Sequence, residues 1–383
     1  SEHDSPVYAS ISGTVSAIQS LPIPGEENNR FVIIQNEGTV KDYAGLQPFA
    51  KPIQDATQDE LIDFLRRAAV INPGQGTAPL WREVETVRKN PVGMIIDGAE
   101  SEPFLTAEYR ILREQFEVVA GGAKILLYIL GIRQCTLALH EKYSEIPSVA
   151  QSDREMIRTV RTQARYPQSD PQQLVYAVTG REFSGASAGE AGYLVIRPSA
   201  CAAVYRAFAT GMPDVERVLT VDGDCIADPG NIAVPIGTSV AEFLGFCGTV
   251  DRPIYSLIYG GPMRGRALDS VNGLIGYDAT GILAFSEALT ASNHSSPLPM
   301  PQERPCIRCG RCVKACPMHL MPLYLGCPDR KGNPNRSVIY CTECGSCTYI
   351  CPSGIPLATY IHNAKEAYAE AQKKPRKRYG NHA

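Results

Sequence analysis

A repeated cysteine run near the C-terminal end decides how the chain is interpreted: CIRCGRCVKACP occupies residues 306–317, and CTECGSCTYICP occupies residues 341–352. Both fit C-x2-C-x2-C-x3-C-P, in which three thiolates of one run bind one [4Fe–4S] cluster and the fourth cysteine binds the cluster of the other run. The predicted ligands of cluster 1 are Cys306, Cys309, Cys312 and Cys351. The predicted ligands of cluster 2 are Cys341, Cys344, Cys347 and Cys316.

The residues between the cysteines favour this interpretation. Two-residue spacers let a tight loop direct successive sulfur atoms and backbone N–H groups at one cube, and Gly310 and Gly345 supply the permissive backbone that such a loop needs. Zinc is the first alternative, because C-x2-C pairs also build tetrahedral sites. Zinc leaves the third cysteine, the three-residue spacer and the Cys-Pro ending unexplained. A disulfide framework, the second alternative, suits a short secreted chain, whereas this one has 383 residues.

Composition limits the remaining functions. A chain of 383 residues with 44% hydrophobic and 20% charged residues has room for two to four domains with real cores. A net charge of −3 argues against a nucleic-acid-binding protein. No signal peptide is recognisable, and the longest apolar run, residues 118–132, is interrupted by glycine and lysine. The cysteines outside the two runs, which we expect to be buried thiols in a reducing compartment, are Cys135, Cys201, Cys225, Cys247 and Cys327.

The first two thirds of the chain indicate β structure followed by an α/β layer domain. Strands are predicted over 7–15 and 31–34, and a helix begins near residue 57. The apolar run 93–96 predicts a strand that delivers the carboxylates of residues 97–103 to the edge where open α/β sheets bind ligands. Helices are then predicted over 106–118, 153–164 and 202–208, and strands over 124–130, 174–178 and 193–196.

The last third indicates a second β-rich region and the cluster module. Strands are predicted over 215–221, 232–234 and 254–259, with a short helix over 240–246. The Ser, Asn and Pro content of 291–304 predicts a linker, and an amphipathic helix is predicted over 357–371. The basic tail that begins at residue 373 is interpreted as a solvated end, with contact to anionic lipid or an acidic partner as the alternative.

Several motifs in this order give the chain a family resemblance. They are ISGTV at 11–15, DGAESEPFLTA at 97–107, YPQ at 166–168, AVTGRE at 177–182, GGPM at 260–263, TGIL at 280–283, and the two cysteine runs with LMP at 320–322. Together they resemble the RnfC subunit of the membrane-bound Rnf ferredoxin:NAD oxidoreductase, whose flavin domain is related to the flavin/NADH subunit of respiratory complex I. The resemblance covers almost everything from residue 5 to about residue 370.

The resemblance implies a multidomain α/β fold. Its parts are half of a lipoyl-like β barrel at 1–48, an α/β domain like the complex I flavin subunit at 49–208, a β-grasp soluble-ligand-binding module with a return to the core at 209–290, a linker at 291–304, a two-[4Fe–4S] ferredoxin-like domain at 305–372 and a basic tail at 373–383. The first half of the barrel found in the family has no counterpart here, so the chain is expected to be shortened or divergent there.

Departures from the family point to a degenerate FMN/NADH site. The family's glycine loop, G-x-G-G-x-G-F-P, appears here as NPGQGTAP at 72–79 and contains Gly74 and Gly76. Three of its four glycine positions are filled otherwise, and we expect the side chains of Asn72, Gln75 and Thr77 to occupy the flavin's space. The family's N-V-G-T segment appears as RPSA at 197–200, and Ser169 replaces a glycine. Glu100 and Glu102, which the resemblance places near the cofactor, are open to two interpretations: cofactor contacts or structural hydrogen-bond acceptors.

The resulting prediction is an iron–sulfur electron-transfer subunit rather than a hydride-transferring enzyme. It relays electrons between a low-potential carrier, ferredoxin, and partner subunits that are integral to the membrane or carry clusters. We expect it to be cytoplasmic and peripheral, on the inner face of the cell membrane. The alternatives are an FMN-containing subunit that oxidises NADH or reduces NAD through the clusters, a soluble reductase accessory for a corrinoid or proline-reductase-type enzyme, and a scaffold in which the clusters are structural.

Overall fold

The computed structural model describes residues 5–20, 30–38, 45–74, 76–143, 155–183, 185–287, 303–328 and 335–373. The chain divides into two compact units, Ser1–Leu289 and Thr290–Ala383. The predicted linker 291–304 and tail 373–383 lie outside the described residues except for 303, 304 and 373. Within the described ranges, no helix is both long enough and apolar enough to cross a bilayer.

The first unit begins with a two-stranded hairpin and two helices. Strands β1 (Gly13–Ser20) and β2 (Arg30–Asn36) pair antiparallel, with an irregularity between Val15 and Ala17. A 3-10 turn, η1 (Ile53–Asp55), leads into helix α1 (Gln58–Ala68). A capping box starts α1, because Thr57 Oγ1 accepts from the Glu60 amide and the Glu60 carboxylate accepts from the Thr57 amide. Helix α2 (Leu80–Arg88) follows.

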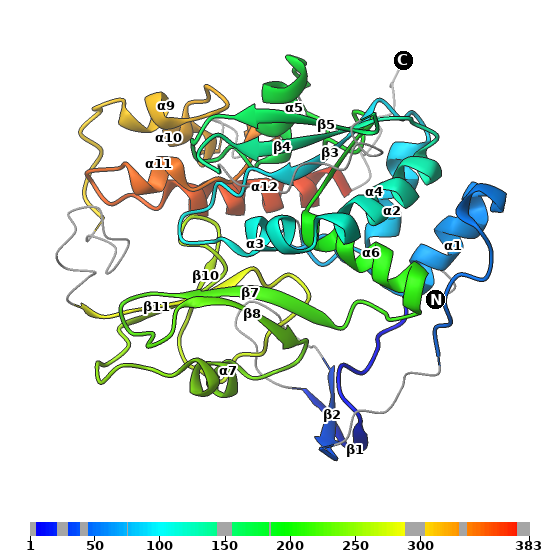
Figure 1. Ribbon diagram of the computed structural model, residues 1–383. Coiled ribbons are helices and arrows are strands. Elements are labelled where there is room, and N and C mark those ends of the chain that lie inside the picture. The colour runs from blue at the N-terminus through cyan, green and yellow to red at the C-terminus, as the bar shows by residue number, and fades with distance from the viewer. Residues whose placement is uncertain are drawn as a thin grey trace, which may run out of the picture. The chain divides into compact units, whose positions relative to one another are not determined.

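The first unit contains a four-stranded parallel sheet (Figure 1). Its strands, in the order β5-β4-β3-β6, are β3 (Gly93–Gly98), β4 (Cys135–His140), β5 (Ile157–Thr162) and β6 (Tyr193–Ile196). Helices α3 (Ala107–Glu114) and α4 (Phe116–Leu130) connect β3 to β4, α5 (Pro171–Thr179) connects β5 to β6, and α6 (Pro198–Thr210) follows β6. Because side chains alternate along a strand, Ile96 faces α4 and α6 whereas Ile95 faces α5.

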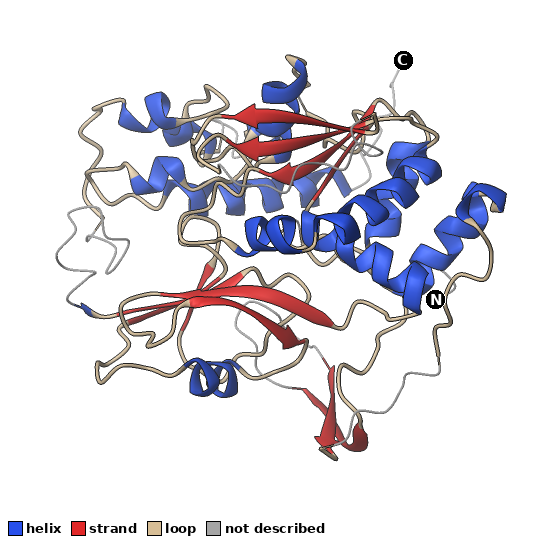
Figure 2. Ribbon diagram, in the orientation of Figure 1, coloured by secondary structure: helices blue, strands red, loops and turns tan. Residues whose placement is uncertain are grey.

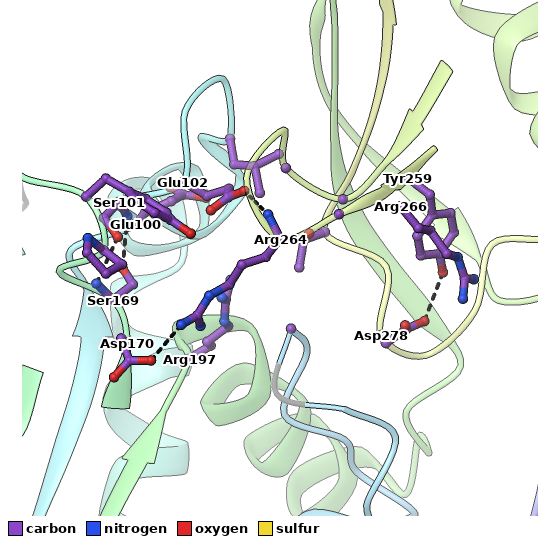
Figure 3. A pocket seen from close by; sticks show the side chains of 18 of the residues that line it. Glu100, Ser101, Glu102, Ser169, Asp170, Arg197, Tyr259, Arg264, Arg266 and Asp278 are labelled. Atoms are coloured by element: carbon purple, nitrogen blue, oxygen red, sulfur yellow. Dashed lines mark hydrogen bonds and ion pairs between the residues drawn. The ribbon is translucent and has the colours of Figure 1, made fainter. Parts of the chain in front are cut away.

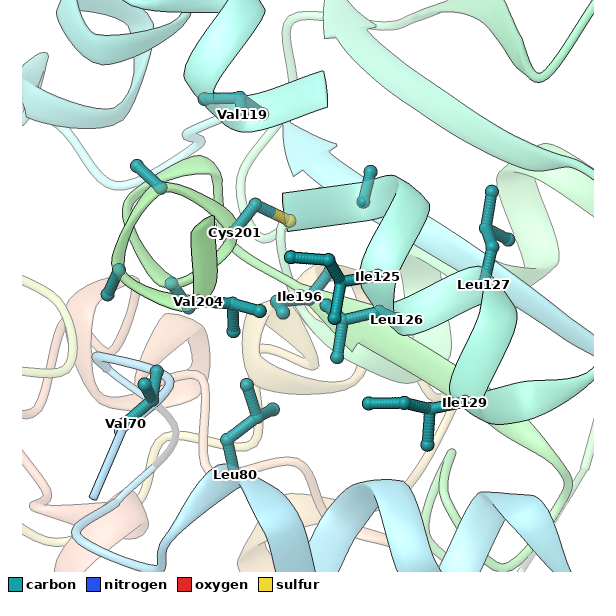
Figure 4. Close-up of a cluster of buried hydrophobic side chains, with 14 of the residues drawn as sticks. Val70, Leu80, Val119, Ile125, Leu126, Leu127, Ile129, Ile196, Cys201 and Val204 are labelled. Carbon is teal, nitrogen blue, oxygen red and sulfur yellow. The ribbon is translucent and has the colours of Figure 1, made fainter. Parts of the chain in front are cut away.

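The main core lies between this sheet and helices α1, α2, α4 and α6 (Figure 4). Helices α4 and α6 approach closely at Gly122, where a Cβ atom would lie 1.8 Å from the carbonyl oxygen of Cys201. Leu126 and Val204 are fully buried beside this crossing. The small residue therefore allows the two helices to pack backbone to backbone.

A second, five-stranded sheet occupies the rest of the first unit (Figure 2). Its order is β10-β9-β11-β7-β8, and the central pair β11 and β7 is parallel while the other pairs are antiparallel. The elements are β7 (Glu216–Asp222), β8 (Gly230–Pro235), α7 (Val240–Cys247), β9 (Ser256–Tyr259), β10 (Arg266–Leu268) and β11 (Gly281–Phe285). Helix α7 packs on one face of this sheet, and α3 lies between the two sheets (Figure 1).

The second unit is built from short helices around the cysteine runs. They are α9 (Arg311–Ala315), α10 (Pro322–Leu325), η2 (Arg336–Tyr340), α11 (Ser346–Tyr349) and α12 (Leu357–Lys373). A small core of Leu325, Val338, Ile355, Leu357 and Ile361 packs against Cys347. The predicted helix 357–371 corresponds to α12.

Three predicted elements are wrong, and one predicted helix is interrupted. The strand predicted over 124–130 is the second half of α4, and the strand predicted over 174–178 is α5, because short apolar runs do not distinguish a strand from a buried helix. Asp170 at the N-cap, Pro171 in the first turn and Gly180 at the end mark α5 as a helix. The helix predicted over 153–164 is β5 where the structure describes it, and the helix predicted over 106–118 breaks at Gln115.

The expected burial of the five cysteines outside the runs is correct for four of them. Cys135, Cys201, Cys225 and Cys247 are buried. Cys327 is exposed, which contradicts the prediction: it follows the short helix α10, and its thiol donates to the carbonyl of Leu323 at 3.4 Å.

Candidate functional site

The two cysteine runs adopt the same backbone conformation. Arg308 and Glu343, the second residues after the first cysteine of each run, both have φ of +54°. Gly310 and Gly345 have φ of +71° and +77°, and each is the N-cap of the short helix that follows. Residues with positive φ at matched positions turn each run into a tight loop around its cysteines.

Backbone amides in these loops point at the cysteine sulfurs. Arg308 N donates to Cys306 Sγ at 3.4 Å, and Glu343 N donates to Cys341 Sγ at the same distance. Leu320 N donates to Cys316 Sγ at 3.3 Å. Amide donors directed at sulfur stabilise the thiolate form that binds iron, so the donor set and the loop conformation fit [4Fe–4S] clusters.

The structure brings the fourth cysteine of each run to the other run. One cavity is lined by Cys316 together with Cys341, Cys344 and Cys347. Burial raises the pKa of Cys347 to about 12, and the neighbouring thiols of Cys341, Cys344 and Cys316 add to this rise. Burial likewise raises the pKa of Cys312, with Cys351 and Cys309 adding to it. Within the described residues, no three Cys, His, Asp or Glu side chains converge as the ligands of a single ion would.

Side chains of helix α12 make polar contacts with the second run. Lys365 Nζ donates to the Cys341 carbonyl and to Glu343 Oε1, at 2.6 Å in both cases. The ring of His362 lies 2.7 Å from Glu343 Oε2. Burial acts to raise the pKa of Glu343, but hydrogen bonds from Lys365 and His362 outweigh it and lower the pKa. A cation is therefore held beside this cysteine run.

A cavity of about 300 Å³ lies at the carboxyl end of β3 in the first unit (Figure 3). Loops that follow β3 and β6 and residues of β9 and β10 contribute to its lining, which consists of Gly74, Gly76, Glu100, Ser101, Glu102, Leu105, Tyr166, Pro167, Ser169, Asp170, Arg197, Tyr259, Gly260, Gly261, Arg264, Gly265, Arg266, Asp278 and Thr280. This is the edge at which the sequence predicted a ligand site. Gly74 lies close to Arg197, since a Cβ atom on Gly74 would be 2.8 Å from Arg197 Nη2.

The carboxylate of Glu100 caps helix α3. Its two oxygens accept from the amides of Glu108 and Tyr109, at 3.0 Å each. Burial raises the pKa of Glu100 to about 7, and the nearby Glu108 carboxylate contributes to the rise. Glu108 itself accepts from the backbone amide and the hydroxyl of Ser199. Glu100 therefore fastens β3 to the start of α3.

The carboxylate of Glu102 fastens the β3 edge to the loop between β9 and β10. Its Oε1 accepts from the amides of Met263 and Arg264 at 2.7 and 2.9 Å. Gly261 faces the same side chain, and a Cβ atom there would lie 1.8 Å from Glu102 Cγ. Burial raises the pKa of Glu102. Of the two interpretations left open by the sequence, the structure shows both glutamates as acceptors for backbone amides.

Other polar groups around the cavity also bond to each other. Ser101 and Ser169 each donate a backbone amide to the hydroxyl of the other at 2.9 Å, and Arg264 pairs with Asp170 at 2.6 Å. Tyr259 donates its hydroxyl to Asp278 at 3.0 Å (Figure 3). Serine at position 169 thus supplies a link that glycine cannot make.

Two arginines complete the lining. Arg197 contributes positive charge next to Asp97, Glu100 and Glu102. Arg266 lies over the ring of Tyr259, 4.4 Å from its centroid. The Nε atoms of both arginines are buried, and neither has a hydrogen-bond partner among the described residues.

The expected position of the Asn72 side chain is wrong. Asn72 is buried, its Nδ2 donates to the Val195 carbonyl at 2.9 Å, and its Oδ1 accepts from the Arg197 amide at 3.1 Å. It therefore ties the loop to β6 instead of filling the cavity. Thr77 is exposed, and Gln75 lies outside the described residues.

The sequence prediction missed the residues that face Glu102 and the cations of the cavity and of α12. Arg264 and Arg266 come just after the motif GGPM at 260–263. These two arginines were the available signal for the cations of the cavity. His362 and Lys365 stand three residues apart on the predicted C-terminal helix, a spacing that places them on one face.

Comparisons with known proteins match one family model within each of the two compact units. A family model described as the Nuo51 FMN-binding domain matches residues 65–206, and one described as a 4Fe-4S dicluster domain matches residues 305–355. The NAD+-reducing [NiFe]-hydrogenase shares the fold: its air-oxidized structure matches 63% of this chain and 51% of its own with a TM-score of 0.53 at 16% identity. Its H2-reduced structure matches 86% of this chain and 64% of its own with a TM-score of 0.53 at 14% identity.

Sequence relatives give the family. The C subunit of the proton-translocating ferredoxin:NAD(+) oxidoreductase complex of Clostridium ljungdahlii is 31% identical over 85% of this chain and 70% of the relative. The Na(+)-translocating counterpart of Acetobacterium woodii is 28% identical over 83% and 71%. The C subunit of the ion-translocating oxidoreductase complex of Pasteurella multocida is 30% identical over 96% of this chain but 44% of the relative. The chain belongs to the RnfC family, the C subunits of these ion-translocating oxidoreductase complexes, and its dicluster domain is of the type that holds two [4Fe–4S] clusters.

Proposed function

We propose that this chain is the iron–sulfur electron-transfer subunit of a membrane-associated Rnf-like complex. It relays electrons between a low-potential carrier, ferredoxin, and partner subunits of the same complex. The observation that carries the proposal is the matched geometry of the two cysteine runs, in which Arg308 N and Glu343 N donate to Cys306 and Cys341 at equal distances. A duplicated loop of this kind supports two redox stations in one small unit.

The ligand assignment follows the predicted exchange between the runs. Cluster 1 is assigned to Cys306, Cys309, Cys312 and Cys351, and cluster 2 to Cys341, Cys344, Cys347 and Cys316. When bound, each cluster supplies a site for one-electron exchange. The chain's own groups stabilise negative charge there: amides donate to the thiolates, and Lys365 stands beside Cys341. Apolar side chains such as Leu325 and Ile361 exclude water from the second run.

We infer that the cavity at the β3 edge is a degenerate FMN/NADH site. Two observations support this inference. The carboxylates of Glu100 and Glu102 already accept hydrogen bonds from backbone amides of the protein itself, and Ser169 stands where the family has glycine. A nucleotide would have to compete with these internal bonds. Gly74 and Gly76 line the cavity but do not restore the family's glycine loop. No step of the proposed function therefore passes through a flavin.

The finer architecture is part of the same proposal. The hairpin β1–β2 is assigned to half of a lipoyl-like barrel within 1–48, and the α/β domain to 49–208. The sheet β10-β9-β11-β7-β8 with α7 is assigned to a β-grasp module within 209–290, supported by its central parallel pair. The ferredoxin-like domain is assigned to 305–372. We place the chain on the cytoplasmic face of the cell membrane, where ferredoxin and the integral subunits can both be reached.

One anaerobic preparation tests the proposal. Iron, sulfide and flavin are measured on the same sample, followed by EPR after reduction with dithionite. We expect about eight irons per chain and no stoichiometric flavin. Zinc, or about four irons, contradicts the two-cluster assignment. Released FMN near one per chain, together with bleaching of the clusters by NADH, supports the flavoenzyme role instead.

Two further measurements test the soluble-accessory and scaffold roles. Co-purification with integral membrane subunits is expected, and its absence favours a soluble reductase accessory. The variant Cys306→Ser is expected to block electron flow in an assembled complex, whereas unchanged flow supports a scaffold in which the clusters are structural.

A further inference from the structure

The two cysteine runs share a backbone but differ in the side chains between the cysteines. Arg308, Arg311 and Lys314 of the first run correspond to Glu343, Ser346 and Tyr349 of the second. The first run thus carries three cations where the second carries one acid. Because the backbone is matched, this difference is not required by the fold of the loop.

The cations of the first run have no ionic partner among the residues that the structure describes. Arg308, Arg311 and Lys314 are all exposed. No ion pair joins any of them to another described residue. Glu343 of the second run is instead held by Lys365 and His362. The chain as a whole carries a net charge of −3, so this positive surface is opposite in sign to the molecule.

Apolar side chains lie among these cations. Ile307, between the first two cysteines, is 68% exposed, and Tyr349 and Ile350 are 53% and 36% exposed. Helix α11 contacts helix α9 of the first run, and Tyr349 is the last residue of α11 and Ile350 its C-cap. Cys306 and Cys309 are themselves exposed, whereas Cys344 and Cys347 are buried. An apolar centre with charged surroundings is typical of transient protein interfaces.

We propose that the surface formed by Ile307, Arg308, Arg311, Lys314, Tyr349 and Ile350, called here the first-run surface, docks an acidic one-electron carrier protein. The inference rests on the proposed electron-transfer function and adds to it the surface and the charge of the partner. Charge complementarity selects the partner, since three exposed cations attract a protein with an acidic contact face. One electron passes between the carrier and cluster 1, and no bond is made or broken.

The test measures electron transfer to the full-length, cluster-loaded chain by anaerobic stopped flow. The donor is an acidic two-[4Fe–4S] ferredoxin that has been reduced with dithionite and freed of excess reductant. Arg308→Gln/Arg311→Gln/Lys314→Gln is expected to lower the second-order rate constant at low salt about tenfold or more, because steering by opposite charge is lost. The wild-type rate should fall as salt is added, and the rate of the variant should fall less steeply.

A matched control removes the same number of charges elsewhere. Arg133, Arg158 and Arg336 are exposed cations outside the first-run surface. Changing all three to Gln lowers the net charge equally and should alter the rate less than about twofold if the effect is local. Ile307→Ser, which keeps all charges, should slow transfer without changing its dependence on salt. A rate loss in the control equal to that of the first-run variant overturns the proposal.

Reduction by methyl viologen radical cation separates this inference from the proposed function. A chain that lacks eight irons, or that methyl viologen cannot reduce, contradicts the proposed function itself. Rapid reduction by methyl viologen combined with a ferredoxin rate that ignores the first-run substitutions contradicts only the docking surface. If the triple variant loses its clusters, the wild-type protein decides, because a ferredoxin rate that does not fall with salt overturns the proposal.

Discussion

Substitution of Gly261 by alanine tests how the β3 edge is joined to the second sheet. The added Cβ atom would lie 1.8 Å from Glu102 Cγ, so the glutamate side chain must leave its position. It would then lose the two hydrogen bonds that it accepts from the backbone amides of Met263 and Arg264, at 2.7 and 2.9 Å. The perturbation therefore acts on one identified contact between two parts of the first unit.

The expected loss of unfolding free energy can be worked out from these contacts. Hydrogen bonds to a charged group contribute about 1.5–3 kcal/mol each, and overpacking adds about 1–3 kcal/mol. Release of the carboxylate to water offsets part of the loss, because burial disfavours its charged form, as its raised pKa indicates. We expect Gly261→Ala to lower the free energy of unfolding by about 2–4 kcal/mol.

Urea unfolding followed by fluorescence measures this loss. The chain has one tryptophan, Trp81 on α2, so the signal reports the first unit. Gly245→Ala on α7 is the matched control, because a Cβ atom there meets nothing within 4 Å, and it should stabilise by about 0.5–1 kcal/mol. In a Glu102→Ala background, Gly261→Ala should cost at least about 1 kcal/mol less. A loss below about 1 kcal/mol, or full additivity of the two changes, would refute the reasoning.

Three further predictions concern the core, the cavity and the second cysteine run. Gly122→Ala should cost at least about 3 kcal/mol in the same urea assay, or prevent accumulation of the folded protein, because the clash is with the Cys201 backbone and no rotamer relieves it. Glu100 has its pKa raised from 4.5 to about 7, so the folded state holds this proton more tightly than the unfolded state, and the free energy of unfolding should fall as pH rises from about 4.5 to 7. Glu100→Gln should remove up to about 3 kcal/mol of that fall, measured by urea unfolding at pH 5 and pH 8, and an unchanged pH dependence would count against the assignment. Lys365→Gln should lower the reduction potential of the cluster assigned to Cys341 in an EPR-monitored titration, because a neighbouring cation favours the more negative reduced form, and Glu343→Gln in that background should restore part of it.

The sequence predicted local geometry well where neighbours in the chain decide it. Each cysteine run spans twelve residues, and its loop conformation depends on Gly310 or Gly345 within the same run. Asp170, which caps α5, and Gly180, which ends it, are sequence signals for a helix, whereas the apolar run between them also fits a strand. Short apolar runs lack the periodicity that separates a strand from a buried helix.

Contacts between distant segments could not be predicted in this way. Glu102 was identified as a site residue, but its partners Met263 and Arg264 lie about 160 residues further along the chain. The side chain of Asn72 was expected in the cavity, yet it bonds to the backbone of β6 at Val195 and to the Arg197 amide that follows. A pattern of residue types gives the chemistry that a side chain can perform, whereas the fold decides which group it meets.

The carboxylates of Glu100 and Glu102 at the cavity are already bonded within the protein, whereas the cations of the first-run surface are exposed to water and open to a partner. At the cavity, a ligand that recruited Glu102 would first have to break two amide contacts, and one that recruited Arg197 would withdraw the charge that offsets Asp97 and Glu100. Breaking a buried charged contact costs more than a new one of the same kind returns, because the abandoned group stays out of water. At the first-run surface, Arg308 and its neighbouring cations are already in water and have no ion pair with another described residue to lose. Association is therefore opposed least where the cysteines are exposed, which is the condition for a carrier that must bind briefly and leave.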